Sequence, residues 1–119
     1  MKVLVTGGSS LLGRTVAEQL RDRGEEVFLL QRRAGAPGFA EHLGDVADPA
    51  TVIAAVAGKE AVIHVAARVG ITGSWDEFAK TNIEGTENLL IAALAEGVSR
   101  FVHISSPSVA HHGRALVGI

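Results

Sequence analysis

The sequence predicts one α/β domain over residues 1–119, with a doubly wound parallel sheet. Short apolar runs alternate with segments whose apolar residues recur every three or four positions. That alternation is typical of right-handed strand–helix–strand crossovers. With 47% hydrophobic and 20% charged residues, the chain can build a substantial core. We expect the strand order 3-2-1-4-5, which places a ligand at the C-terminal ends of the first and fourth strands.

The composition excludes several classes of protein. The formal net charge is −2 and there is no basic block, so we expect no nucleic-acid partner. No apolar run approaches the ~18 residues of a membrane span, and the Met1-Lys2 start lacks the apolar core of a secretory signal. Without cysteine, disulfides and thiolate chemistry are excluded. We expect a cytoplasmic protein with no metal site, because His111 and His112 have no acidic neighbour in the sequence.

A glycine-rich turn follows the first apolar run, Val3–Val5. Gly7 can take the positive φ of a tight turn, and Gly13 would let the next helix pack closely on the strand. The helix N-terminus offers free N–H groups and a positive dipole to a pyrophosphate. The sequence therefore predicts a dinucleotide site. Its cofactor-binding residues in this segment would be Gly7, Ser9, Ser10, Leu11, Leu12 and Gly13.

Ser10 departs from the usual glycine pattern, which has a middle glycine at this place. Its hydroxyl could hydrogen-bond a phosphate oxygen, or its side chain could crowd the phosphates. The alternative to ligand binding is a purely structural strand–turn–helix unit, which would also use glycines in its turn.

The end of the second expected strand, Val27–Leu30, bears on the choice of cofactor. An Asp or Glu about 20 residues past the glycine turn would accept from the ribose hydroxyls and favour NAD. The residues here are Gln31, Arg32 and Arg33. Because Arg32 or Arg33 could pair with a 2′-phosphate, the sequence favours NADP, with NAD the alternative. Either arginine could instead be a solvated residue at a strand end.

The remaining expected strands are Phe39–Leu43, Ala61–Val65 and Phe101–Ile104. Asp48 and Pro49 are typical of a helix start, and Gly58 would end that helix. We expect its core-facing residues to be Val52, Ile53 and Val56. A longer helix is predicted between the capping box at 74–77 and Gly97. Its buried stripe is expected to comprise Phe78, Leu89, Leu90, Ala93 and Leu94.

Five segments, in order along nearly the whole chain, resemble the extended short-chain dehydrogenase/reductases, the NAD(P)-dependent epimerase/dehydratase group. They are Thr6-Gly7-Gly8-x-x-x-Leu12-Gly13, Gly44-Asp45-Val46-x-Asp48, Val62-Ile63-His64-Val65-Ala66-Ala67, Asn82-x-x-Gly85-Thr86-x-Asn88-Leu89-Leu90 and Phe101-Val102-His103-Ile104-Ser105-Ser106-Pro107-Ser108-Val109. The segments 66–74 and 105–109 are most similar to the 3β-hydroxysteroid dehydrogenase-like branch. Bacterial ketoreductases of 2-alkyl-3-oxoalkanoates are similar there too. The resemblance implies a Rossmann-type domain that is incomplete at its C-terminal edge.

The resemblance also implies a role for several residues. Asp45 would accept from the adenine amino group and Val46 would pack on the ring, although Asp45 could simply cap a turn. Ala66 and Ala67 would let the cofactor approach the backbone, and Asn82 would fix backbone groups beside the site. Ser106 is the expected catalytic residue, with Ser105 as the alternative. It would hydrogen-bond the substrate oxygen while a Tyr-x-x-x-Lys pair transfers the proton and hydride moves to or from the nicotinamide.

The chain contains no tyrosine, so it cannot supply that pair. We expect it to be the N-terminal part of a longer oxidoreductase, epimerase or dehydratase that acts on a small substrate, sterol-like or 3-oxoacyl-like. A homodimer is possible for such an enzyme. The alternatives are a non-catalytic NAD(P)-binding sensor module and a structural domain without a ligand. If the chain is such a part, it should expose apolar surface beside Phe101–Ile104.

Overall fold

The computed structural model describes residues 1–7, 11–32, 38–66 and 75–105, which form a five-stranded sheet flanked by helices. The strands are β1 (Lys2–Thr6), β2 (Glu26–Gln31), β3 (Ala40–Leu43), β4 (Ala61–Ala66) and β5 (Arg100–Ser105). Their order is β3-β2-β1-β4-β5, and every neighbouring pair is parallel. The predicted α/β class and strand order are confirmed.

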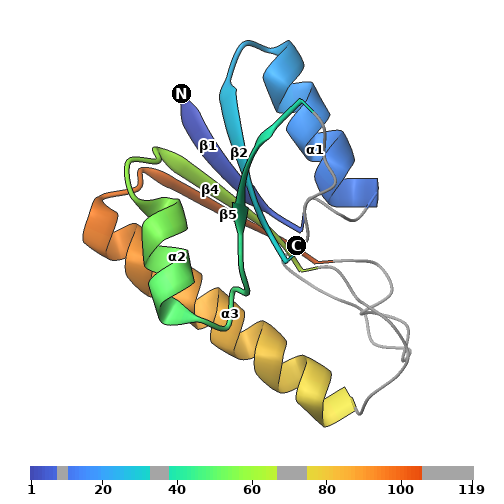
Figure 1. Ribbon diagram of the computed structural model, residues 1–119, viewed down its shortest axis with the longest axis vertical. Coiled ribbons are helices and arrows are strands. Elements are labelled where there is room, and N and C mark those ends of the chain that lie inside the picture. Colours follow the sequence, from blue (N-terminus) through green and yellow to red (C-terminus); the bar gives the residue numbers. More distant parts are fainter. Residues whose placement is uncertain (8–10, 33–37, 67–74, 106–119) are drawn as a thin grey trace.

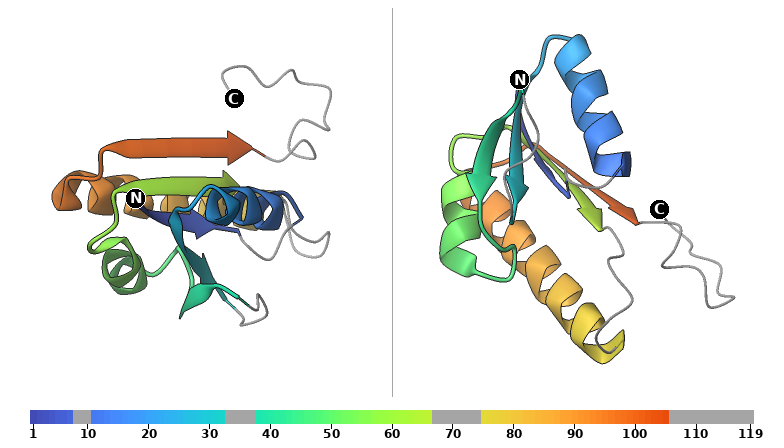
Figure 2. Two further views of the ribbon diagram at one scale, coloured as in Figure 1. Left: turned by 90° about the horizontal axis from the view of Figure 1, so that it is seen from above. Right: turned by 45° about the vertical axis from the view of Figure 1, so that its right-hand side comes forward.

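Helices cover both faces of the sheet (Figures 1 and 2). On one face, α1 (Leu11–Asp22) packs its Ala17 against a cluster that includes Val3 and Val5 of β1. On the other face lie α2 (Pro49–Val56) and α3 (Trp75–Glu96). They pack on a second cluster, which includes Leu4. Successive β1 side chains thus enter opposite cores, which explains the unbroken apolar run of this strand.

The predicted helix signals act as expected. The carboxylate of Asp48 accepts from the Ala50 N–H at 3.2 Å, and Pro49 is the first residue of α2. This arrangement caps α2 without using the N–H that proline lacks. Beyond α1 and α3, Gly24 and Gly97 take φ values of +92° and +71°. Both are positive-φ glycines that end a helix.

Two predictions about buried helix residues are wrong. Ile53 is 56% exposed, because α2 turns Val52, Ala55 and Val56 inward instead. In α3, Leu90 and Leu94 are exposed, the latter by 82%, whereas Leu89, Ala92 and Ala93 are buried. Positions 89, 92 and 93 follow the i, i+3, i+4 spacing of one helical face, and positions 90 and 94 form the next row around the helix. The predicted burial of Phe78 lies outside the described side chains.

The apolar surface expected beside the fifth strand is present in part, because Val102 of β5 is exposed. Among the described residues, no helix combines the length and apolar character needed to cross a membrane.

Candidate nucleotide site

Gly7 directly follows β1 and has the positive φ predicted for it, +75°. A Cβ on Gly7 would lie 2.6 Å from the carbonyl oxygen of Val65, well inside van der Waals contact. Glycine is therefore required here for two independent reasons, backbone conformation and the close approach of β4. Gly7 lies where β1 and β4 end side by side, at the point where the strand order reverses.

A buried polar network joins the ends of these two central strands. The hydroxyl of Thr6 lies 2.5 Å from Nδ1 of His64, and Nε2 of His64 lies 3.1 Å from the hydroxyl of Thr86 on α3. The ring of His103 on β5 stacks on His64 with a centroid separation of 5.2 Å. Burial, and secondarily the charge of His103, lowers the pKa of His64 from 6.5 to about 4. His64 is therefore neutral at pH 7.

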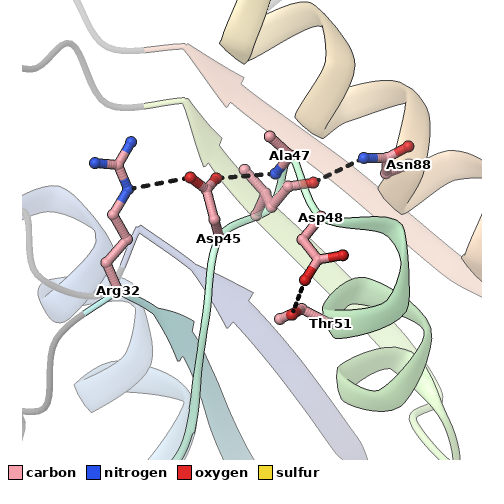
Figure 3. A network of polar contacts seen from close by, with 7 residues as sticks. Arg32, Asp45, Ala47, Asp48, Thr51 and Asn88 are labelled. Atoms are coloured by element: carbon pink, nitrogen blue, oxygen red, sulfur yellow. Dashed lines mark hydrogen bonds and ion pairs between the residues drawn. The ribbon is translucent and has the colours of Figure 1, made fainter.

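A second polar network lies on the β2–β3 side of the sheet (Figure 3). Arg32, directly after β2, pairs with Asp45 through Nε and Oδ2 at 3.6 Å, and both side chains are partly exposed. The other Asp45 oxygen, Oδ1, accepts from the Ala47 N–H at 2.9 Å. Asp45 therefore caps a turn, which is the alternative that the sequence left open. It also forms an ion pair with the Arg32 guanidinium.

Helix α3 contacts this same loop through two of its residues. The side-chain amide of Asn88 donates to the Val46 carbonyl at 2.9 Å, as Figure 3 shows. A Cβ on Gly85 would lie 2.5 Å from Cγ2 of Val46, so the absence of a side chain lets the loop approach the helix. Val46 itself is partly buried against the core between the sheet, α2 and α3.

Comparison with known proteins identifies the family. The model of the NAD dependent epimerase/dehydratase family matches residues 3–115. The chain belongs to this family. Among similar proteins, 2-alkyl-3-oxoalkanoate reductase of Stenotrophomonas maltophilia is 41% identical over 115 residues, and the match covers 93% of this chain. The 3-beta-hydroxysteroid dehydrogenase of Mycolicibacterium neoaurum is 35% identical, and that match covers 98% of this chain.

The fold of the chain is also similar to that of a solved structure. A short-chain dehydrogenase/reductase superfamily protein from Agrobacterium tumefaciens with bound NAD superimposes on all of this chain and on 37% of its own, with TM-score 0.78 and 34% identity. The chain spans 35% of the length of each of the two curated relatives above.

The residues predicted for the site of this epimerase/dehydratase domain differ in how much the structure describes of each. Gly7, Arg32, Asp45 and Val46 are described in full and lie at the C-terminal edge of the sheet. In the first turns of α1, Gly13 is buried and Leu12 is partly exposed. For Leu11, Ala66 and Asn82 the structure gives only the element, namely α1, β4 and α3. Ser9, Ser10, Arg33, Ala67 and the expected catalytic Ser106 lie outside the described residues.

Gln31, the last residue of β2, lies at this same edge of the sheet and was not selected as a candidate site residue from the sequence. Its side chain is 7% exposed, and its amide nitrogen donates to the Glu41 carboxylate. Its carbonyl oxygen Oε1 is buried without a hydrogen-bond partner among the described residues. Gln31 occupies the strand end at which an Asp or Glu would have favoured NAD, so its position was itself the signal that could have identified it.

Proposed function

We propose that this chain is the cofactor-binding part of an NAD(P)-dependent oxidoreductase. In this proposal hydride moves between the nicotinamide and a hydroxyl or keto carbon of a small substrate. The observation that carries the proposal is the close approach of Gly7 to the Val65 carbonyl, in a chain of this family, at the sheet edge where β1 and β4 end and shortly before α1 begins. A helix N-terminus close to the end of such a strand suits a pyrophosphate.

The described residues fit a dinucleotide. The unpartnered Oε1 of Gln31 is a buried acceptor at the end of β2, where a ribose hydroxyl could donate to it. Asp45 presents a partly exposed carboxylate on the same side, suited to the adenine amino group. The cofactor would supply the hydride. The chain's own residues would bind and orient it.

We further propose that NADP is preferred over NAD. Arg32 carries a guanidinium whose side chain is 70% exposed, and it lies directly after the strand end that faces the ribose. Its partner Asp45 is 3.6 Å away in an exposed pair, which costs little to separate. A 2′-phosphate offers Arg32 a charge-assisted bidentate contact in exchange.

Cofactor titration of Arg32→Ala tests both proposals. We expect the variant to bind NADPH at least about tenfold more weakly, because it loses the charge-assisted contact with the 2′-phosphate, with NADH binding unchanged. Arg14→Ala is the matched control, because Arg14 is an exposed arginine of α1 paired with Glu18 at 3.4 Å. Equal losses for both cofactors would contradict the NADP preference. If the unaltered chain binds neither cofactor, the proposed function itself is wrong.

The substrate, the assembly and the location are also proposals. The named relatives act on 2-alkyl-3-oxoalkanoates and 3-beta-hydroxysteroids, so a 3-oxoacyl-like or sterol-like ketone is the substrate class to assay. Ser106 would contact its oxygen, in a cytoplasmic enzyme. The exposed Ile91 and Leu94 of α3 support a homodimer. A sedimentation coefficient that stays monomeric at high protein concentration would contradict the dimer.

A further inference from the structure

One turn of α3, residues 85–88, contacts two segments that are far apart in the sequence. Thr86 hydrogen-bonds His64 at the end of β4, and Asn88 hydrogen-bonds Val46 in the loop between β3 and α2. The proposed function places the pyrophosphate beside the first segment and the adenine beside the second. The same turn thus contacts both of the segments beside which the proposed function places the adenosine half of the cofactor.

The contact on the sheet side fixes the helix. A neutral imidazole has one N–H donor and one acceptor nitrogen, so His64 can satisfy both the Thr6 and the Thr86 hydroxyls at once. His64 is 3% exposed and Thr6 is fully buried. Because a buried polar group left without its partner is costly, this network holds the turn at one position relative to the end of β1.

The contact on the loop side transfers that position to Val46. Asn88 donates to the Val46 carbonyl, while Gly85 leaves just enough room for the Val46 side chain. Asp45 precedes Val46, and its Oδ1 is fixed by the Ala47 N–H. The remaining described contact of the Asp45 carboxylate is the exposed pair with Arg32, which is too weak to orient a loop.

We propose that Asn88, together with Gly85, is a positioning residue for adenine recognition. Its hydrogen bond to the Val46 carbonyl fixes the position of the Val46 peptide relative to α3, so that the Asp45 carboxylate faces the adenine amino group of the cofactor. Asn88 touches the protein backbone and acts only through Asp45. This inference rests on the proposed function.

The test compares NADH with its hypoxanthine analogue, which lacks the adenine amino group. The purified full chain should bind NADH about fivefold more tightly than the analogue, the value of one hydrogen bond. In Asn88→Asp, which keeps the shape of the side chain but loses the donor, that ratio should fall toward one. Glu87→Gln, a change at the exposed neighbouring position, should keep the ratio of the unaltered chain.

Each other outcome has a definite meaning. An equal loss for both nucleotides in Asn88→Asp would show a merely structural role and overturn the inference. Equal binding of both nucleotides by the unaltered chain would overturn the inference as well. If the unaltered chain binds neither nucleotide, the proposed function itself is wrong. If Asn88→Asp does not fold, Gly85→Ala replaces it. Its methyl group would displace Val46 and should lower the same ratio.

Discussion

The two polar networks at the C-terminal edge of the sheet differ in almost every physical respect. At the centre, Thr6, His64 and Thr86 connect β1, β4 and α3 in the interior, with His64 only 3% exposed. On the β2–β3 side, Arg32 and Asp45 form an ion pair whose side chains are 70% and 42% exposed. The first network is neutral and shielded from water. The second is charged and accessible.

This difference separates framework from binding surface. Removing one partner of a buried hydrogen bond lowers the stability of the fold, since water cannot replace that partner. Exposed charges exchange partners at little cost, since the pair itself contributes only about 0–1 kcal/mol. A ligand can therefore compete for Arg32 and Asp45, whereas the buried groups of the central network cannot exchange their partners at such a low cost.

The largest expected effect lies at the centre. Gly7→Ala should lower the free energy of unfolding by roughly 3 kcal/mol, because a positive φ and a clash with the Val65 carbonyl add together. Gly24→Ala is the matched control. Gly24 also has a positive φ, but no atom lies within 4 Å of its added Cβ, so about 1 kcal/mol is expected. Urea denaturation measures both. Equal losses would mean that the approach of β4 to the turn carries no energetic weight.

The pH dependence of stability should be of similar size. Above pH 6.5, His64 is neutral in the folded and the unfolded chain. Between pH 6.5 and about 4 the unfolded chain takes up the proton first, because the folded pKa is about 4. The contribution of His64 should therefore fall by roughly 3 kcal/mol as pH falls through this window.

The comparison of His64→Asn with the unaltered chain isolates this contribution from the carboxylates that titrate in the same window. Denaturation midpoints across the window should change less with pH in His64→Asn. His103→Asn should keep most of the slope, because His103 is exposed and burial is the first cause of the His64 shift. An unchanged slope in His64→Asn would contradict the idea of a buried neutral imidazole.

The smallest expected effect is at the exposed pair. Arg32→Ala should change the free energy of unfolding by less than about 1 kcal/mol, even though the same change should reduce NADPH binding. Denaturation in low and high salt measures this, since screening should reduce the difference further. If Arg32→Ala lowered the free energy of unfolding by several kcal/mol, Arg32 would stabilise the fold as the buried network does, and the two regions would not differ in this respect.

Sequence patterns were sufficient for the fold because each strand and helix carries its own local signal. The parallel order followed from strands alternating with helices, and the helix limits followed from Asp48, Gly24 and Gly97. The buried faces of α2 and α3 were less predictable. Apolar residues at 53, 90 and 94 fit a helical stripe, but only the packed structure shows which stripe meets the sheet.

The candidate site was predictable where one residue sufficed and not where two segments had to meet. The positive φ of Gly7 could be expected from its place after a strand. The Arg32–Asp45 pair and the Asn88–Val46 contact join residues from different loops and helices. Local sequence contains no signal for such pairs. Asp45, Val46 and Asn88 each stand in a family motif and Arg32 stands at a strand end, but the sequence does not indicate which of them pair.

The pairing of β1 with β4 also has a consequence for how the chain folds. Thr6 and His64 are separated by 58 positions. At synthesis rates of about 5–20 residues per second, β4 leaves the ribosome roughly 3–12 s after β1. During that interval β1 can pair with β2, but its other edge stays open. We therefore expect the pairing of β1 with β4 to form late in folding, after a period in which an apolar strand edge is exposed to aggregation.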